Sequence, residues 1–464
     1  MAHFDLLVIG SGKGGKTLAT QMANRGQNVA LIEKKWIGGS CINVACIPTK
    51  TLVKTAKVAH TLQNLAHYGI VPKHPAHLSP LPLEMQPIFD RKRYVVETMI
   101  DRNQQTFDSS GVHFLPGSAS FVNKNQVSID DAKTKTLHSA ERIVINSGAR
   151  PALPNIPGLL NANPLTNESL LELNYIPEHL LILGAGYIGC EFAQAFRRLG
   201  AEVTLVDRNS RLLPKEDPEI SQAIHELLQS EGIQIILGAT TKNVSGLSGE
   251  EVSLHLEDAL SSTTILGSHL LVALGRLPNT EELNLQAANV RVSERGGIEV
   301  NHRLQTTNPN IWAVGDVTGG PQFTHVSWDD YRVLLDNFQG GNRTTENRLI
   351  PYTLFTDPEL GRVGITEDQA RQQGRNIRIA RLAAKSIPRA VTSGEMLGVL
   401  KAVIDADTDE ILGASILCAQ AGEILATIQV AMLCKMKTTA LRDVIFSHPT
   451  MAEAINDWFY KLSV

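Results

Sequence analysis

The stretch Phe4-Asp-Leu-Leu-Val-Ile-Gly10-Ser-Gly-Lys-Gly-Gly15 decides how the first part of this chain folds. Its apolar run predicts a buried parallel strand that ends at Gly10. The residues after Gly15 predict a helix, and residues 28–32 predict a second strand that is followed by Glu33. Strand, glycine turn, helix, strand and acidic residue in this order are typical of a dinucleotide-binding unit.

Each residue of this pattern has a physical role in holding a dinucleotide. Gly10 allows the tight turn, Gly12 lets the backbone approach a pyrophosphate, and Gly15 permits close packing of the helix. The N-terminus of the helix attracts the phosphates. Glu33 would accept hydrogen bonds from ribose hydroxyls. We therefore predict a first dinucleotide site at this turn.

The same unit occurs a second time, with a glycine turn that starts 174 positions after the first. Five positions repeat without a gap: the three turn glycines, the glycine after the helix and the acidic residue. In the second copy these are Gly184, Gly186, Gly189, Gly200 and Asp207. Two dinucleotide sites in one chain favour electron transfer between two cofactors.

The composition is that of an ordinary soluble protein. The chain has 464 residues and a formal net charge of −4, so neither nucleic acid nor an anionic membrane is an expected partner. Five cysteines are few and odd in number, which argues against a secreted disulfide scaffold. We find no signal-peptide pattern and no apolar run of the roughly 20 residues that a membrane span needs. We therefore expect a cytoplasmic protein.

Two cysteines lie close together in residues 38–50, Gly-Gly-Ser-Cys41-Ile-Asn-Val-Ala-Cys46-Ile-Pro48-Thr-Lys. On an ideal helix, residues five apart have Cα atoms about 8–9 Å from each other, whereas a disulfide rarely spans more than about 7 Å. A bonded pair therefore needs an irregular turn, which Pro48 is suited to produce. So short a bridge would add little stability, which favours a redox role. Two buried thiols or half of a metal site are the alternatives, although the nearest histidine, His60, is 14 positions beyond Cys46.

The rest of the chain predicts connecting elements and a third domain. Ile70 to Phe89, rich in proline and histidine, predicts an irregular surface excursion. Residues 91–107 predict a helix and residues 112–121 a strand. From about Arg348 the chain has strands and amphipathic helices without nucleotide glycines, which predicts a separate domain.

Two further positions are candidates for chemistry. Asp316 follows a strand, at the kind of edge where doubly wound domains bind ligands, and could accept hydrogen bonds from a sugar-like chain; a simple turn is the alternative. His448 is a candidate base whose ring Glu453 could orient, and an ordinary surface histidine is its alternative.

With these motifs in this order, the chain resembles the FAD-dependent pyridine nucleotide-disulfide oxidoreductases, which include dihydrolipoamide dehydrogenase, glutathione reductase and mercuric reductase. The resemblance covers essentially the whole chain. It implies an α/β fold with two doubly wound Rossmann-like domains and a C-terminal α+β domain that makes a homodimer. The expected boundaries are 1–148 and 279–347 for the FAD-binding domain, 149–278 for the NAD(P)-binding domain and 348–464 for the dimerisation domain.

The resemblance also implies roles for single residues. Cys46 would face the flavin, Cys41 would exchange with substrate, and Lys50 beside the flavin would pair with Glu191. The residues expected to bind FAD are Gly10, Gly12, Gly15, Glu33, Lys34, Gly39, Ser40, Lys50, Ala119, Ser147, Gly148, Asp316 and Thr324. Those expected to bind NAD are Gly184, Gly186, Gly189, Asp207 and Gly275. His448, oriented by Glu453, would serve the cysteine pair of the partner subunit. No resident metal is expected.

The resemblance leaves three hypotheses for function. Dihydrolipoamide dehydrogenase leads, because the cysteine pair and the histidine are intact. A reductase of metal ions or reactive species is the alternative, because Phe446 replaces the first histidine of a frequent His-x-His and because residues 387–390 resemble the mercuric branch and a related reductase linked to reactive-chlorine resistance. The third hypothesis is a subunit that docks into a 2-oxo-acid dehydrogenase complex.

The preference for NAD over NADP depends on a few charges. Asp207 would bond a free ribose 2′-hydroxyl and repel a 2′-phosphate, which favours NAD. Arg208 and Arg211 follow closely and could offset that repulsion, so NADP is not excluded.

Overall fold

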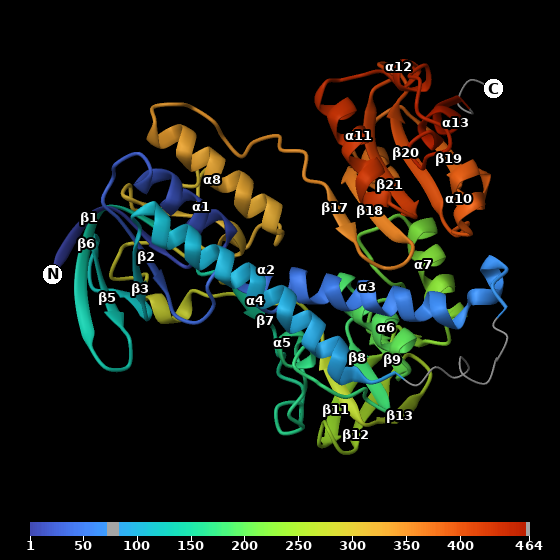
Figure 1. The fold of residues 1–464 in the computed structure, drawn as a ribbon, viewed down its shortest axis with the longest axis horizontal. Coiled ribbons are helices and arrows are strands. Elements are labelled where there is room, and N and C mark those ends of the chain that lie inside the picture. The colour runs from blue at the N-terminus through green and yellow to red at the C-terminus, as the bar shows by residue number, and fades with distance from the viewer. Residues whose placement is uncertain (72–82, 461–464) are drawn as a thin grey trace. The chain divides into compact units, whose positions relative to one another are not determined.

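The computed structural model describes residues 1–71 and 83–460 (Figure 1). The chain divides into two compact units, and each is assembled from three segments. Unit 1 comprises residues 1–51, 87–152 and 275–348, and unit 2 comprises residues 52–86, 153–274 and 349–464.

Unit 1 is built on a seven-stranded sheet with the order β3-β2-β1-β6-β5-β4, in which β16 also pairs with β6. Its strands are β1 (Ala2–Ile9), β2 (Val29–Glu33), β3 (His113–Pro116), β4 (Ser118–Phe121), β5 (Gln126–Asp130), β6 (Lys135–Ile145) and β16 (Ile311–Ala313). A two-stranded antiparallel sheet is formed by β7 (Ala149–Pro151) and β15 (Arg276–Pro278). The helices are α1 (Lys13–Ala23), α2 (Ser40–Asn43), α8 (Thr324–Phe338), the start of α3 (Cys46–Gln63) and most of α4 (Met85–Ser110).

Both faces of this sheet are buried, which explains the apolar run before Gly10. Along β1, Leu6 and Val8 lie in the core that includes Leu18 of α1. Leu7 and Ile9 lie in a second core on the other face. The strand pairs in parallel with β2 and β6. A central parallel strand covered on both faces favours a continuous apolar run, and residues 6–9 of β1 form one.

Unit 2 contains a second parallel sheet and two antiparallel sheets. The parallel sheet, with the order β10-β9-β8-β14, contains β8 (His179–Leu183), β9 (Glu202–Asp207), β10 (Gln234–Leu237) and β14 (His269–Val272). A three-stranded antiparallel sheet contains β11 (Thr240–Gly246), β12 (Val252–Glu257) and β13 (Ser262–Gly267). The C-terminal sheet, with the order β17-β18-β21-β20-β19, contains β17 (Tyr352–Leu354), β18 (Glu359–Gly364), β19 (Ile377–Ala383), β20 (Val399–Asp405) and β21 (Ile411–Cys418).

The helices of unit 2 flank these sheets. They are α5 (Asn167–Leu170), α6 (Tyr187–Leu199), α7 (Pro218–Ser230), α9 (Glu367–Gln372), α10 (Pro388–Ser393), α11 (Ala421–Leu433), α12 (Thr438–Arg442) and α13 (Ala454–Tyr460). Helix α11 packs against β18 and β21, and Ile424 and Ile428 lie in the C-terminal core. The predicted fold class, two doubly wound units and a C-terminal α+β domain, is therefore confirmed.

Two of the predicted elements differ from the structure. Most of the excursion expected for residues 70–89 lies outside the described residues, but its end was predicted wrongly because α4 begins at Met85. Residues 112–121 form two strands rather than one. Gly117 separates β3 from β4 with a φ of 137°, a conformation that a β-branched or bulky residue avoids.

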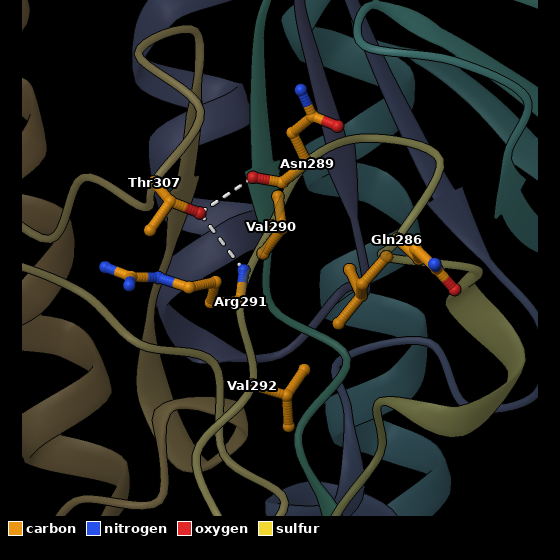
Figure 2. Close-up of a pocket in the computed structure, with 7 residues that line it drawn as sticks. Gln286, Asn289, Val290, Arg291, Val292 and Thr307 are labelled. Atoms are coloured by element: carbon orange, nitrogen blue, oxygen red, sulfur yellow. Dashed lines mark hydrogen bonds between the residues drawn. The ribbon is translucent and has the colours of Figure 1, made fainter.

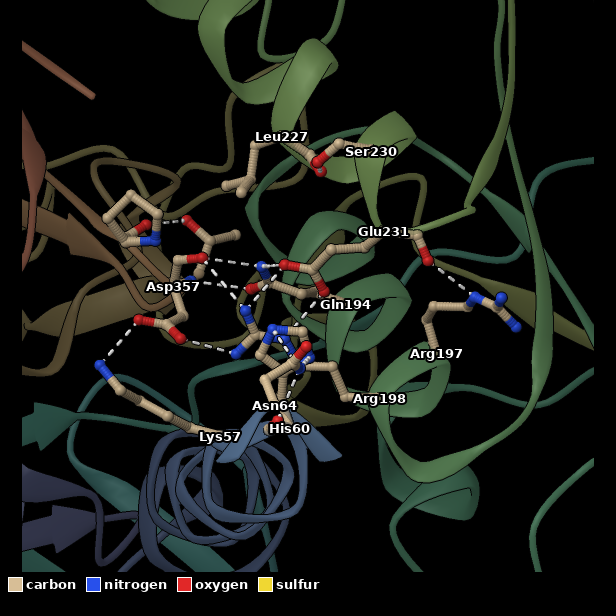
Figure 3. Close-up of polar contacts among 12 residues, drawn as sticks. Lys57, His60, Asn64, Gln194, Arg197, Arg198, Leu227, Ser230, Glu231 and Asp357 are labelled. Atoms are coloured by element: carbon tan, nitrogen blue, oxygen red, sulfur yellow. Dashed lines mark hydrogen bonds and ion pairs between the residues drawn. The ribbon is translucent and has the colours of Figure 1, made fainter. Parts of the chain in front are cut away.

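Unit 2 also contains a partly buried group of charges, which we call the Arg198 cluster. Figure 3 shows four of its members, Arg198, Glu231, Asp357 and Lys57, and the fifth is Glu395. The Arg198 guanidinium contacts Glu231 Oε1 and Asp357 Oδ2, each at 2.7 Å. Lys57 Nζ contacts Asp357 Oδ1 at 2.8 Å and Glu395 Oε1 at 2.5 Å. These ion pairs join α3, α6, the end of α7 and the loop after β17.

Candidate functional site

An acidic side chain anchors the glycine turn in both nucleotide units. Glu33 Oε2 accepts a hydrogen bond from the backbone N–H of Ser11 at 2.8 Å. Asp207 Oδ2 accepts one from the backbone N–H of Ala185 at 2.7 Å. Ser11 and Ala185 are the middle residues of the two Gly-x-Gly turns. The repeat read from the sequence is therefore also a repeat of hydrogen bonds.

The two turns fit the pyrophosphate of a dinucleotide. Gly10 and Gly184 have φ of 100° and 110°, where glycine is favoured. Helices α1 and α6 begin after Gly12 and Gly186, and neither N-cap residue offers a side chain to the helix N–H groups. A Cβ placed on Gly186 would meet no atom within 4 Å. Helix N-termini left open in this way can donate hydrogen bonds to phosphate.

Every residue predicted to bind FAD lies in unit 1. Asp316 lies in a 3-10 turn after β16, where burial raises the pKa of its carboxyl against the opposing charge of Arg276 at 3.7 Å. Ser147 Oγ donates to the carbonyl of Asn279 at 2.8 Å. Lys34 is exposed and forms an ion pair with Glu282, which also lies in unit 1. A group that binds in this unit would thus meet a buried carboxyl and an uncapped helix N-terminus.

The two cysteines lie on separate helices. Cys41 is in α2 and Cys46 is the first residue of α3. The chain leaves helical geometry at Val44, which has φ −140° and ψ 13°. The irregular turn that a bonded pair needs is therefore present, but it lies before Pro48. Pro48 itself is in the first turn of α3, where a proline is tolerated.

The structure brings the two sulfurs together beside a hydroxyl. The two residues are present as thiols, and a hydrogen bond to Cys46, followed by burial, raises the pKa of Cys41. Thr324 Oγ1 lies 3.5 Å from Cys46 Sγ. The resemblance implied a contact between the backbone of Thr324 and FAD, but it did not predict that the hydroxyl lies beside Cys46. Because Cys46 starts an 18-residue helix, the helix dipole favours negative charge at its position.

His448 and Glu453 form the predicted pair. His448 Nδ1 lies 2.7 Å from Glu453 Oε2, and the side chains are 70% and 14% exposed. A proton on Nδ1 that bonds the carboxylate leaves Nε2 as the acceptor that faces solvent. This is the arrangement of a base oriented by an acid.

The other predicted residues are placed within their own units. Glu191 of α6 is buried and accepts a hydrogen bond from the backbone N–H of Phe355 at 2.9 Å. Lys50 is half-buried in α3. The pairing of Lys50 with Glu191, and the service of His448 to the partner subunit, stay predictions.

A hollow of about 700 Å³ lies elsewhere on unit 1, between residues 285–292 and Thr307 (Figure 2). Thr307 Oγ1 donates to the carbonyl of Asn289 at 2.7 Å and accepts from the N–H of Arg291 at 3.0 Å. Its lining contains none of the predicted site residues.

Residues 1–71 and 83–460 contain neither a membrane-spanning helix nor a cluster of metal ligands. In these ranges no helix is both long and apolar enough to cross a membrane. Within the same part of the chain no group of three or more His, Cys, Asp or Glu side chains is placed to hold a metal ion.

Comparisons with known proteins match the whole chain. The family model for pyridine nucleotide-disulphide oxidoreductase matches residues 4–330, and the model for the dimerisation domain of the same family matches residues 350–458. A probable pyridine nucleotide-disulfide oxidoreductase, RclA of Escherichia coli, is 39% identical and covers 99% of both chains. Mercuric reductase of Bacillus cereus is 36% identical over 97% of this chain and 70% of its own. Dihydrolipoyl dehydrogenase of Chlamydia muridarum is 30% identical over 97% of this chain and 95% of its own.

A solved structure gives the same result for the fold. The Cu(II) complex of the HOCl-induced flavoprotein disulfide reductase RclA from Escherichia coli superposes with a TM-score of 0.91. The two chains are 37% identical, and the match covers 100% of each.

Proposed function

Because this chain belongs to the pyridine nucleotide-disulphide oxidoreductase family, we propose that it is an NAD(P)H-dependent reductase in which Cys41 and Cys46 pass electrons to a thiol-reactive acceptor, with Cu(II) as the first candidate. Membership makes the chain a flavoprotein oxidoreductase with a redox-active disulfide centre that uses FAD and a nicotinamide dinucleotide. The dimerisation domain makes it a homodimer.

One observation carries the proposal: the thiol of Cys41 in α2 interacts with the thiol of Cys46, the first residue of α3, and this interaction raises the pKa of Cys41. A dithiol in contact can close to a disulfide without moving either helix far, and it can be reopened by two electrons. The hydroxyl of Thr324 lies beside Cys46 and lowers the pKa of Cys41. The N-terminus of α3 favours negative charge on Cys46.

FAD, the two glycine turns and the cysteine pair would each carry a different part of the reaction. FAD, when bound, supplies the ring that exchanges a hydride with the nicotinamide, a step that no side chain can perform. The two glycine turns would bind the dinucleotides, with Glu33 and Asp207 fixing the turns. A dithiol that reduces two Cu(II) ions to Cu(I) becomes a disulfide and releases two protons. One NADH and one proton return that disulfide to the dithiol, and NAD⁺ leaves.

Three features support a metal ion as acceptor. RclA and four mercuric reductases are 33–39% identical to this chain, whereas three dihydrolipoyl dehydrogenases are 28–30% identical. Soft thiolates also react well with soft metal ions. Phe446 and the stretch at residues 387–390, where Ile387 is buried ahead of α10, depart from the lipoamide pattern in the same direction. Copper is the first metal to test because the matched RclA structure is a Cu(II) complex.

Dihydrolipoamide dehydrogenase is the second candidate, because the His448–Glu453 pair is intact at 2.7 Å. In that reaction a base has to take the proton of a substrate thiol before it attacks Cys41. Electron transfer from a thiolate to Cu(II) has no such requirement. His448 therefore distinguishes the two candidates.

The test is turnover of the purified FAD-loaded homodimer, without oxygen, on Cu(II), Hg(II), lipoamide and glutathione disulfide, and separately on oxygen. Cu(I) is trapped with a Cu(I)-specific chelator, and Cys46→Ser is the control for direct reduction of copper by NADH. The proposal expects the highest kcat/KM with Cu(II) and its loss in Cys46→Ser. A kcat/KM that is higher on lipoamide than on Cu(II) would transfer the assignment to the second candidate.

Three finer assignments are part of the proposal. We assign FAD to residues 1–148 and 279–347, NAD(P) to residues 149–278 and the dimer contact to residues 348–464. NAD is favoured over NADP, because Asp207 Oδ1 and Oδ2 are held by backbone N–H groups as a fixed negative charge. Docking into a 2-oxo-acid dehydrogenase complex belongs to the second candidate alone.

A further inference from the structure

A half-buried lysine lies in the first nucleotide unit without a role in the pattern that predicted the unit. Lys16 is in α1, directly after Gly15, and its ammonium donates a hydrogen bond to Asn103 Oδ1 of α4. Among the residues that the structure describes, no carboxylate pairs with it. A buried ammonium that has only an amide partner costs free energy, so its position calls for an explanation.

The N-cap residues of α1 and α2 lie close together. A Cβ on Gly39, the N-cap of α2, would lie 2.7 Å from Gly12 Cα, the N-cap of α1. A Cβ on Gly38 would lie 3.3 Å from Asn103 Nδ2. Asn103 therefore touches both the Lys16 ammonium and the loop that leads into Cys41.

The charge of Lys16 acts on Cys41. The hydrogen bond with Cys46 and burial raise the pKa of the Cys41 thiol, whereas the hydroxyl of Thr324 and the charge of Lys16 lower it and so oppose part of that rise. Burial and the nearby charge of Lys13 lower the pKa of Lys16 itself to about 8, and Cys41 opposes that shift. Lys16 is therefore mostly cationic at neutral pH. The titratable groups around the two residues are Lys13, Cys41 and Cys46.

We propose that Lys16, held in place by Asn103, is a positioning residue whose positive charge stabilises the thiolate of Cys41 during exchange with the acceptor. Ionisation of the Cys41 thiol releases one proton to solvent and leaves a negative charge on Sγ. A cation close to a thiol favours that charged form. The inference rests on the proposed role of Cys41 as the sulfur that exchanges with the acceptor.

The test measures the reactivity of Cys41 itself rather than turnover. In FAD-loaded Cys46→Ser protein, which keeps a hydroxyl in place of the second sulfur, iodoacetamide alkylation of Cys41 is followed from pH 6 to 10 by mass spectrometry of its peptide. The series adds Lys16→Met, Lys16→Arg and Lys13→Met to this background. Lys13 is exposed on the same helix and carries the same charge, so it is the matched control.

Lys16→Met is expected to slow alkylation at pH 7.5 by about three- to tenfold, which corresponds to a rise of about half to one unit in the apparent pKa of Cys41. Lys16→Arg should restore the rate to within about twofold, and Lys13→Met should change it by less than that. Equal rates in Lys16→Met and its parent, or equal slowing by Lys13→Met, would overturn the proposal.

The FAD content of Lys16→Met distinguishes an effect of Lys16 on Cys41 from a role of Lys16 in binding FAD. Loss of FAD in Lys16→Met, with an unchanged alkylation rate once FAD is restored, would assign the lysine to the cofactor phosphates and overturn the proposal. If Lys16→Met does not fold, Asn103→Ala replaces it and should slow alkylation in the same direction. Failure of the proposed function would give a different result. Lys16→Met would still slow the alkylation of Cys41, but the same substitution in the otherwise native enzyme would leave turnover unchanged.

Discussion

Removal of the Arg198 guanidinium is the perturbation whose effect the structure specifies most closely. The Arg198 side chain is 5% exposed and Glu231 is 10% exposed, so neither charge has much contact with water (Figure 3). Arg198→Met keeps most of the aliphatic volume and deletes the charge. Glu231 would keep only the hydrogen bond from Gln194 Nε2 at 2.8 Å, whereas Asp357 would keep Lys57 at 2.8 Å.

These remaining contacts determine the expected magnitude. Removing one partner of a buried ion pair costs about 3–5 kcal/mol, because the other charge stays buried without compensation. Since Asp357 keeps a cation, we expect the lower end of that range, about 3 kcal/mol. Replacing both charges, in Arg198→Met with Glu231→Gln, should recover more than half of this loss. The surface pair of Asp90 with Arg93, at 3.5 Å, is the control, and Asp90→Asn should cost less than about 1 kcal/mol.

The assay is urea denaturation of the FAD-loaded homodimer, followed by far-ultraviolet circular dichroism at fixed protein concentration. It should be repeated at low pH. Burial raises the pKa of Asp357, but the charges of Arg198 and Lys57 outweigh burial and lower it. The stabilisation from this carboxylate is therefore present above its unfolded pKa and is lost as the pH falls through the lower folded value. A loss below about 1 kcal/mol in Arg198→Met, or a double variant less stable than the single one, would refute the reasoning.

Three other predictions concern the site and the acid side of the stability profile. His448→Gln should lower lipoamide turnover by about a hundredfold or more but Cu(II) turnover by less than about fivefold, because only the thiol substrate needs a base; kcat on both acceptors measures this. Gly186→Val should raise the KM for NADH at least about tenfold, because Gly186 belongs to the turn that would hold the pyrophosphate, and it should leave the Tm unchanged, because its Cβ has open space. Gly189→Val should lower the Tm, since its Cβ would lie 1.9 Å from a backbone carbonyl. A hydrogen bond from Lys401 lowers the pKa of Glu367 from 4.5 to about 2, so this carboxylate stabilises the fold above pH 4.5 and loses that effect as the pH falls towards 2. The difference in Tm between Lys401→Met and the native chain should accordingly shrink over this range, and a constant difference would contradict it.

The nucleotide units could be predicted from the sequence because their signals are local. A turn that needs positive φ requires glycine, and a strand buried on both faces favours a continuous apolar run. A glycine with positive φ that follows an apolar run occurs at Gly10 and again at Gly184. The acidic residues Glu33 and Asp207 were predicted for ribose, and the structure adds that each also fixes its own turn.

The remaining features depend on contacts between distant segments, which spacing does not reveal. Nothing in the sequence pairs Lys16 with Asn103, since 87 residues separate them and neither belongs to a motif. The hydroxyl of Thr324 beside Cys46, 278 residues apart, is another such contact. The break at Val44 was attributed to Pro48, because proline is the residue that distorts helices in general, whereas the first turn of α3 accommodates it.

The central claim is that Cys41 and Cys46 store electrons beside a bound flavin. Anaerobic titration of the oxidised FAD-loaded protein with dithionite tests it most directly, because each flavin and each disulfide takes up two electrons. The account predicts four electrons per flavin in the native chain and two in Cys46→Ser. Uptake of only two electrons per flavin by the native chain would contradict it.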